Sequence, residues 1–177
     1  ALAEGRVPAP VLVVAPTSVV GNWVAEAKVF TPDLAATAIA ETRARRRTTL
    51  ADAVRGADVV VTSYALFRLE FDAYAELEWS TLILDEAQFV KNHQSVAYQC
   101  ARRLDAPVQI AMTGTPLENN LMELWSILSI TSPGLFPSPR RFADYYAKPI
   151  EKERDDARLD QLRRRIAPFM VRRTKEE

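Results

Sequence analysis

The sequence predicts an α/β domain with a mostly parallel β-sheet, and two patterns carry that prediction. Short apolar runs bounded by turn signals and rich in β-branched residues are typical of strands buried on both faces. Helical segments separate these runs, and such alternation is typical of βαβ units. Apolar residues make up 48% and charged residues 26% of the 177 residues, as in globular proteins. This length suits one domain with its own core.

Each predicted strand is a short run that ends at a proline or a polar residue. The strands are predicted at 11–15, 36–40, 58–63, 81–84 and 108–112, and the run at 36–40 is the weakest of them. Helices are predicted between the strands at 19–30, 48–55 and 95–104.

Only helices are predicted after residue 112. The first runs through residue 130 and opens with a capping box, Asn120 followed by Glu123. The second opens at Ser138-Pro139, with proline at its tolerated first position. The third opens at Asp155-Asp156 and carries arginines at 163–165, where they suit the negative end of the helix dipole.

Composition excludes several classes of protein. A single cysteine, Cys100, excludes an internal disulfide framework and fits a reducing compartment, and one histidine, His93, leaves no Cys/His metal cluster. No run approaches the roughly 18 apolar residues of a membrane span, and we expect no signal peptide. The excess of arginine over lysine and the abundance of alanine suggest a bacterial genome, hence a cytoplasmic, nucleoid-associated location, or a nuclear one if the source is eukaryotic.

Net charge is zero, so overall charge does not indicate nucleic acid. Basic residues nevertheless cluster at 43–47, 163–165 and 172–175. A solvated face explains such clusters as well as a ligand does. The turn at 43–47 therefore either touches DNA or faces solvent.

Polar residues follow four of the predicted strands, and ligands of open α/β sheets bind outside the carboxyl ends of strands. The four ends are Pro16-Thr17-Ser18, Thr62-Ser63-Tyr64, Asp85-Glu86 and Thr113-Gly114-Thr115. Asp85 directly follows an apolar strand, where a carboxylate can hold Mg²⁺ beside a nucleotide. Glu86 can orient or deprotonate a water for attack on a γ-phosphate.

The tetrad Asp85-Glu86-Ala87-Gln88 resembles the DEAx-box (Walker B motif) of superfamily-two helicases and translocases, and Thr113-Gly114-Thr115-Pro116 resembles their third motif. More narrowly, the chain resembles Swi/Snf-type DNA-translocating ATPases over nearly its whole length. The stretches that carry this resemblance, in family order, are 12–18 with Asn22-Trp23, 62–64, 85–88 with Lys91-Asn92, 113–119 with 123–125, and 168–175.

The resemblance implies a three-layer RecA-like lobe followed by a helical extension, with ATP and Mg²⁺ as cofactors of the full-length protein and double-stranded DNA as its partner. It implies that Asp85 contacts Mg²⁺, through water, and that Glu86 positions the hydrolytic water. It assigns coupling of hydrolysis to DNA to Gln88, Thr113, Gly114 and Thr115. Contacts to DNA are implied for Pro16, Thr17, Ser18, Thr62, Ser63, Tyr64, Lys91 and Asn92. Arg172, Arg173 and Lys175 are implied to lie towards a second RecA-like lobe, and the remodelled target is a DNA-bound protein.

Two features depart from the family pattern. The tetrad ends in Gln88, where the family often has histidine, and glutamine still donates and accepts hydrogen bonds. The larger departure is the phosphate-gripping loop (Walker A), which ends in Gly-Lys-Ser/Thr: none of the five glycines precedes a lysine. We therefore expect residues 1–118 to form a partial ATP-binding lobe and 119–177 a helical extension and linker. The isolated chain is expected to be inactive.

Two other functions stay open at this stage. The natural protein could itself lack the loop and serve as a degenerate DNA- or protein-binding module, which the reading frame upstream of Ala1 would decide. A metal-dependent nuclease using Asp85 and Glu86 would need further carboxylates at the same strand ends, which offer hydroxyls instead. Four other residues are interpreted as packing rather than chemistry, namely Trp23, Trp79, Trp125 and Cys100, and His93 is interpreted as solvated.

Overall fold

A computed structural model describes residues 9–114 and 120–172 of the chain. In this part, five strands form one sheet of order β2-β3-β1-β4-β5, and all four strand pairs are parallel. The strands are β1 (Val11–Ala15), β2 (Ala36–Ile39), β3 (Val59–Ser63), β4 (Thr81–Leu84) and β5 (Val108–Ala111). The predicted α/β fold with a mostly parallel sheet is confirmed, including its weakest strand.

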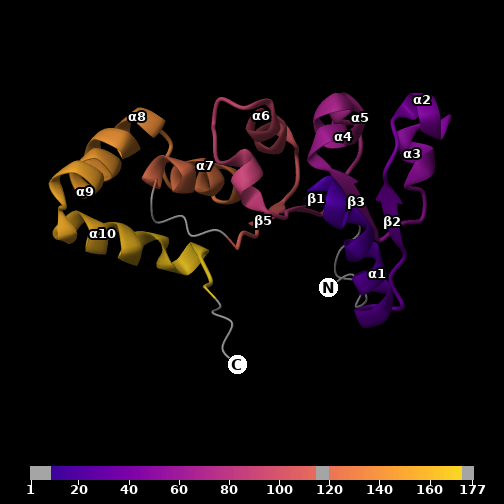
Figure 1. Cartoon of the computed structure of the whole chain (residues 1–177), viewed down its shortest axis with the longest axis horizontal. Coiled ribbons are helices and arrows are strands. Elements are labelled where there is room, and N and C mark those ends of the chain that lie inside the picture. The colour runs from indigo at the N-terminus through magenta and orange to yellow at the C-terminus, as the bar shows by residue number, and fades with distance from the viewer. Residues whose placement is uncertain (1–8, 115–119, 173–177) are drawn as a thin grey trace.

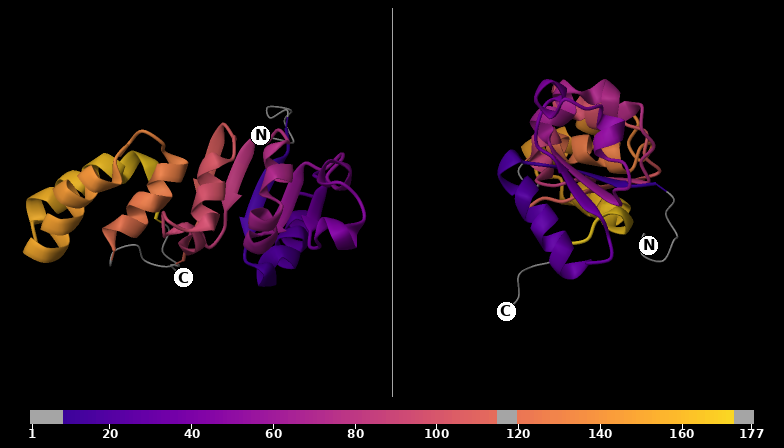
Figure 2. Two further views of the ribbon diagram at one scale, coloured as in Figure 1. Left: turned by 90° about the horizontal axis from the view of Figure 1, so that it is seen from above. Right: turned by 90° about the vertical axis from the view of Figure 1, so that its right-hand side faces the viewer.

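Helices lie on both faces of the sheet, so the fold has three layers (Figures 1 and 2). One face carries α1 (Val20–Phe30), and the other carries α4 (Tyr64–Leu69) and α6 (Val96–Arg103). Shorter helices complete this region: α2 (Arg43–Arg46), α3 (Leu50–Ala53) and α5 (Phe71–Ala75). The predicted helices at 19–30 and 95–104 are confirmed, and the one predicted at 48–55 is reduced to α3.

The core forms on both faces of the sheet because the central strand β1 is apolar at every position. Leu12 and Val14 of β1 pack into the larger cluster on the α4 side, and Val13 packs with Val20 on the α1 side. All three strand residues are fully buried. Burial of each such side chain contributes about 1.5–3 kcal/mol relative to exposure, so this central strand anchors the fold.

The α1 face is uncovered at its β5 end. Val108 and Ile110 of β5 pair in register with Thr81 and Ile83, which places them on the α1 side of the sheet. They are 48% and 43% exposed, although the other strands bury their equivalent positions more fully. This edge therefore presents apolar side chains that no described element covers.

A helical region follows the sheet and occupies the end of the molecule opposite β2 (Figure 1). It comprises α7 (Leu121–Thr131), α8 (Pro139–Phe142), a π-helical turn (Ala143–Ala147), α9 (Lys148–Glu153), α10 (Asp156–Ile166) and a 3₁₀ turn (Ala167–Phe169). Every helix in the described residues is too short or too polar to cross a bilayer.

The helix starts predicted in this region are confirmed. The Asn120 side chain accepts hydrogen bonds from the backbone N–H groups of Met122 and Glu123, at 3.0 and 3.3 Å. Ser138 and Asp155 cap α8 and α10 in the same way. These bonds satisfy N–H groups that have no partner within the helix, which is why polar residues predict the starts.

The helices α4 and α5 are not predicted from the sequence. Ser63 ends β3 and also caps α4, since its Oγ accepts a hydrogen bond from the backbone N–H of Leu66 at 3.2 Å. A strand thus passes directly into a helix with no glycine or proline between them. Phe67 and Tyr74 of these helices are fully buried, so the missed segment supplies much of the larger core.

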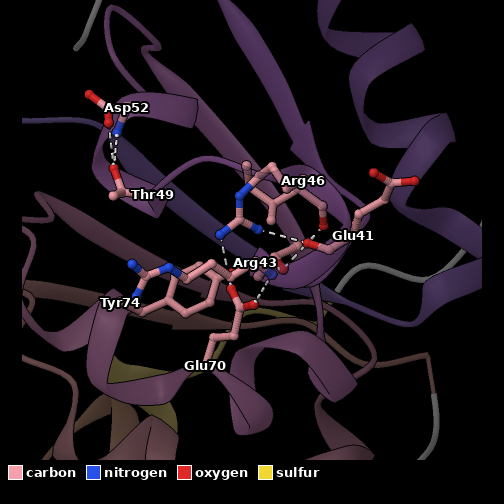
Figure 3. Close-up of polar contacts among 9 residues, drawn as sticks. Glu41, Arg43, Arg46, Thr49, Asp52, Glu70 and Tyr74 are labelled. Carbon is pink, nitrogen blue, oxygen red and sulfur yellow. Dashed lines mark hydrogen bonds and ion pairs between the residues drawn. The ribbon is translucent and has the colours of Figure 1, made fainter.

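The basic stretch at 43–47 forms α2 and is anchored at its centre (Figure 3). Arg46 donates from one guanidinium nitrogen to the carbonyl of Glu41, at 2.7 Å, and from another to the carboxylate of Glu70, at 3.1 Å. Both partners of this ion pair are almost buried, with 11% and 13% of their side-chain surfaces exposed. Arg43, Arg45 and Arg47 are exposed. Solvent therefore reaches three of the four arginines, while Arg46 holds the turn.

We predict that Glu70→Ala destabilises the fold by about 3 kcal/mol, because it leaves the nearly buried Arg46 charge unpaired. Arg55→Ala serves as the matched control, since Arg55 pairs with Asp52 while 80% of its own side chain is exposed. Loss of that exposed pair costs about 1 kcal/mol or less. Urea unfolding followed by circular dichroism measures both. Equal midpoints for the two variants would contradict the anchoring role of Glu70.

Candidate functional site

The carboxyl ends of β3, β1, β4 and β5 lie side by side at one edge of the sheet. The register pairs Ala15 with Ser63 and Val14 with Leu84, and it pairs Leu84 with Ala111. The polar residues that follow these four strands are therefore neighbours, as parallel pairing requires. The candidate site consists of these strand ends and of the side chains that reach them.

Asp85 stands at the centre of this edge. Its backbone N–H continues the sheet by donating to the carbonyl of Val14 at 2.9 Å. Its carboxylate accepts two hydrogen bonds, one at Oδ1 from the backbone N–H of Glu86 (2.9 Å) and one at Oδ2 from the indole N–H of Trp23 (2.8 Å). The half-buried carboxylate is thereby held in one orientation.

Glu86 adopts a left-handed backbone conformation, with φ 49° and ψ 57°. Such a conformation in a residue other than glycine costs about 1–3 kcal/mol and persists only where the surroundings enforce it. Here the enforcing contacts include the Glu86 N–H bond to Asp85 and the bond that Glu86 Oε2 accepts from Gln88 Nε2, at 2.7 Å. This left-handed residue lies between the end of β4 and the 3₁₀ turn at Ala87–Val90.

A continuous chain of hydrogen bonds joins Glu86 to the end of β5. Gln88 donates to Glu86 and accepts from the Thr113 hydroxyl, with Thr113 Oγ1 and Gln88 Oε1 2.9 Å apart. Backbone bonds run in parallel, since Ala87 N–H donates to the Met112 carbonyl at 2.8 Å. Gly114 follows and is exposed. Thr115, the remaining predicted coupling residue, lies outside the described residues.

Tyr64 supports the tetrad from the β3 side. Its hydroxyl donates to the backbone carbonyl of Asp85 at 2.7 Å, and its ring stacks on Phe89 with 4.8 Å between ring centroids. Burial, and secondly the carboxylates of Asp85 and Glu86, raise the pKa of Tyr64 well above its ordinary value. The phenol therefore keeps its proton at physiological pH and remains a donor.

The structure places Thr62, a predicted DNA contact, in the interior of the domain, and the contact itself stays a prediction. Thr62 is fully buried, and its hydroxyl lies 2.7 Å from the hydroxyl of Tyr74, so no phosphate reaches it in this conformation. Its role is internal packing and hydrogen bonding. Ser63 and Tyr64 are also buried, at 5% and 4% exposure, and both make the internal bonds described above.

The strand end after β1 is open to solvent instead. Thr17 and Ser18 are exposed on a 3₁₀ turn (Thr17–Val19) that leads directly into α1. The turn is closed by a bond of 3.0 Å from the N–H of Val19 to the carbonyl of Pro16. Two exposed hydroxyls thus follow β1, the strand that pairs with β4, and a ligand can reach them from solvent.

The other predicted contact residues that the structure describes are exposed. Lys91 forms an ion pair with Glu123 of α7, at 3.0 Å, and Asn92 is exposed with its Oδ1 accepting from the N–H of Gln94. Arg172 is exposed beyond α10. Arg173 and Lys175 lie outside the described residues.

The carboxylates fit Mg²⁺ beside a nucleotide, but they do not make a complete metal site. In residues 9–114 and 120–172, no group of three or more metal-ligating His, Cys, Asp and Glu side chains comes together. Nucleotide-bound Mg²⁺ typically uses one or two carboxylates, with phosphates and waters supplying the rest. The carboxylate oxygens of Asp85, which directly follows β4, meet that requirement.

Trp23 is the residue that the sequence interpretation missed. It was interpreted as packing, and its half-buried ring does pack against the cluster on the α1 face. Its indole N–H also binds Asp85. The available signal was chemical: a partly buried indole N–H usually finds an acceptor. Trp79 and Trp125 are confirmed as core residues whose N–H groups donate to backbone carbonyls, and Cys100 is buried on α6.

His93 differs from its interpretation as a solvated residue. It is only half-exposed, and its ring lies edge-on to Trp125, with centroids 5.5 Å apart. Tyr98 makes a similar contact at 6.4 Å. His93 therefore packs where the loop after β4 meets α7.

Comparison with known proteins identifies the family. Residues 3–177 match the model of the SNF2-related domain. The chain is 41% identical over 174 residues to the putative ATP-dependent helicase/translocase YwqA of Bacillus subtilis, which covers 98% of this chain and 19% of the relative. It is 33% identical to the ISWI chromatin-remodeling complex ATPase ISW1 of Saccharomyces cerevisiae, over 97% of the chain and 15% of the relative.

A solved structure gives the same result for the fold. The Sulfolobus solfataricus SWI2/SNF2 ATPase core in complex with dsDNA superposes with a TM-score of 0.85 at 34% identity, covering 99% of this chain and 36% of that one. The chain thus spans about a fifth of these curated relatives' length and about a third of the solved core. The chain belongs to the SNF2-related domain family, and its sheet is the RecA-like α/β sheet of the SWI2/SNF2 ATPase core.

Proposed function

We propose that this chain is the part of a double-stranded-DNA-stimulated ATPase that handles the metal ion and the attacking water, and that the full-length protein translocates along duplex DNA. The observation that carries the proposal is the hydrogen-bonded chain Glu86–Gln88–Thr113 next to the oriented carboxylate of Asp85. The names of the bacterial and yeast relatives, and the duplex bound to the solved core, support it.

The two carboxylates take different roles. Bound MgATP would supply the phosphoryl group and the charge neutralisation that its transfer needs. Asp85 would hold the metal ion, directly or through water, because its carboxylate retains acceptor capacity beyond the two bonds it makes. Glu86 would hold the attacking water and accept its proton, and the bond from Gln88 holds the Glu86 carboxylate.

Gln88 and Thr113 couple the site to its surroundings. Gln88 holds the carboxylate of Glu86 with its amide N–H while its amide oxygen accepts from Thr113. A shift of the loop after β5 would therefore move the Glu86 carboxylate. Gly114 and Thr115 follow Thr113 in the sequence, so we include them in the proposed coupling element.

Thr17 and Ser18 are the proposed duplex contacts of this lobe. Their exposed hydroxyls, with the backbone of Pro16, suit a phosphate contact that is independent of base sequence. Asn92 and Lys91 are further proposed contacts, and Lys91 would exchange Glu123 for a phosphate. A DNA-bound protein is the proposed target of translocation, in line with the remodelling named for the yeast relative.

The phosphate grip and a second lobe are proposed to come from outside these 177 residues. None of the five glycines is followed by lysine, so the chain supplies no Gly-Lys-Ser/Thr loop. The exposed apolar face of β5 supports an additional layer at the edge next to Asp85. Arg172, with Arg173 and Lys175, is proposed to face the second lobe.

Displacement of a triplex-forming strand tests the proposed translocation. The full-length protein is expected to strip a third strand from duplex DNA when ATP is present, and not when a non-hydrolysable analogue replaces it. Binding of duplex without ATP turnover or strand displacement would instead identify a non-hydrolysing DNA-binding module. ATP turnover without strand displacement would contradict the proposed translocation but not the proposed ATPase activity.

We predict that Gln88→Ala in the full-length protein lowers the stimulation of ATP turnover by duplex DNA about tenfold, within the range typical of coupling between sites. The variant breaks both bonds of the Glu86–Gln88–Thr113 chain while affinity for DNA is retained. Gln99→Ala is the matched control, since it removes an exposed glutamine that bonds only to the His93 carbonyl among the described contacts. Equal stimulation ratios in the two variants would contradict coupling through Gln88.

A further inference from the structure

Trp23 differs from the other two tryptophans in what its N–H group binds. Trp79 and Trp125 donate to the backbone carbonyls of Tyr74 and Phe136, at 2.8 and 2.9 Å, inside the core. Trp23 donates to the carboxylate of Asp85, a residue 62 positions away that stands at the mouth of the site. A bond between a half-buried donor and a charged acceptor is stronger than one to a neutral acceptor. Its position indicates a role beyond packing.

The bond from Trp23 restricts the orientation of the Asp85 carboxylate, the group to which the proposed function assigns the metal ion. Oδ2 of Asp85 is held by Trp23, and Oδ1 is held by the Glu86 N–H. Of these two donors, the Glu86 N–H belongs to the next residue and cannot fix the carboxylate relative to another element. Trp23 is the donor that ties Asp85 to a separate helix.

That helix begins at the proposed DNA contact. The 3₁₀ turn at Thr17–Val19 runs without a break into α1, and Trp23 lies in the first turn of the helix. The helix otherwise packs mainly across β2 and β3. A duplex that presses on Thr17 and Ser18 therefore acts on the same rigid element that holds the Asp85 carboxylate.

We propose that Trp23 is a positioning residue that links duplex binding at the Thr17–Val19 turn to metal binding at Asp85. Duplex DNA fixes the position of the start of α1, and α1 in turn fixes the position of the indole N–H. The indole then fixes the orientation of the Asp85 carboxylate, which receives the metal-nucleotide complex. This inference rests on the proposed function and adds the route by which DNA acts on the metal side of the site. It is separate from the Gln88 chain, which acts on the water side.

Metal binding measured without turnover tests the link. The probe is Mn²⁺ in place of Mg²⁺, with a non-hydrolysable ATP analogue, titrated by electron paramagnetic resonance into the full-length protein with and without duplex DNA. Wild type is expected to bind the metal-nucleotide complex more tightly when duplex is present. Trp23→Phe keeps an aromatic ring and removes the N–H, so it is expected to weaken metal binding about tenfold and to abolish the effect of duplex.

Trp79→Phe is the matched control, because it also removes one indole N–H bond, but one that ends on a backbone carbonyl in the core. It is expected to keep wild-type metal binding and its response to duplex. Trp23→His retains a ring N–H and is expected to recover part of the response, which separates the hydrogen bond from the bulk of the ring. Thermal melting identifies any variant that is unfolded, and the comparison then uses the other Trp23 variant.

Metal binding in Trp23→Phe that equals Trp79→Phe, with and without duplex, would overturn the link. Equal metal affinity of the wild-type protein with and without duplex would overturn the link too. The proposed function would still stand in that case if DNA stimulates ATP turnover. Absence of any metal-nucleotide binding would remove both the link and the proposed function.

Discussion

Replacing Glu86 with glutamine in the full-length protein is expected to lower ATP turnover by at least about a hundredfold, the contribution typical of a positioned general base. The amide oxygen of the new side chain can still accept the bond from Gln88, so the geometry of the loop is kept. What is lost is the negative charge that orients the water and accepts its proton. Affinity for MgATP is expected to be retained, because the carboxylate of Asp85 is unchanged.

The control for this substitution is Glu76→Gln, which removes a carboxylate from an exposed position at the end of α5. Phosphate release and nucleotide binding are measured for both variants under the same salt and DNA conditions. Wild-type turnover in Glu86→Gln would remove Glu86 from the catalytic role. A parallel loss of nucleotide binding would reassign it to holding the metal-nucleotide complex.

A polypeptide of these 177 residues alone is expected to release no phosphate from ATP, with or without duplex DNA. The chain presents the carboxylates of Asp85 and Glu86 but no Gly-Lys-Ser/Thr loop, and a transferring phosphoryl group needs backbone N–H groups and a lysine to hold its oxygens. Malachite-green detection of phosphate measures this directly, and circular dichroism confirms that the polypeptide is folded. The full-length protein serves as the positive control.

Phosphate release by the short polypeptide that duplex DNA stimulates would contradict this expectation. It would mean that other groups hold the phosphates. The same result would remove the reason for proposing a phosphate grip outside these residues.

Much of the fold follows from local patterns in the sequence. The run that forms β1 is apolar at every position and ends before Pro16, so within an α/β alternation it predicts a strand buried on both faces. Helix starts at Asn120, Ser138 and Asp155 follow from single side chains that satisfy free N–H groups. The transition from β3 to α4 does not follow from local patterns, because Ser63 both ends the strand and caps the helix.

The site is predictable to the same extent. Asp85 and Glu86 are found because a parallel sheet brings its carboxyl ends to one edge. The bond from Trp23 to Asp85 depends on how α1 is rotated against the sheet, and nothing local encodes that rotation. The burial of Thr62 has a similar origin: this residue of β3 meets Tyr74, and Tyr74 lies on α5, a helix that the sequence does not predict.

Steady-state phosphate release by the full-length protein, compared with and without duplex DNA in the wild type and in Glu86→Gln, tests the central claim most directly. The wild type is expected to be stimulated by duplex about tenfold or more, in the range typical of coupled sites. Glu86→Gln is expected to show no release above background in either condition. Stimulation that persists in Glu86→Gln, or a wild type that releases no phosphate with duplex present, would contradict the assignment of this strand edge to ATP hydrolysis.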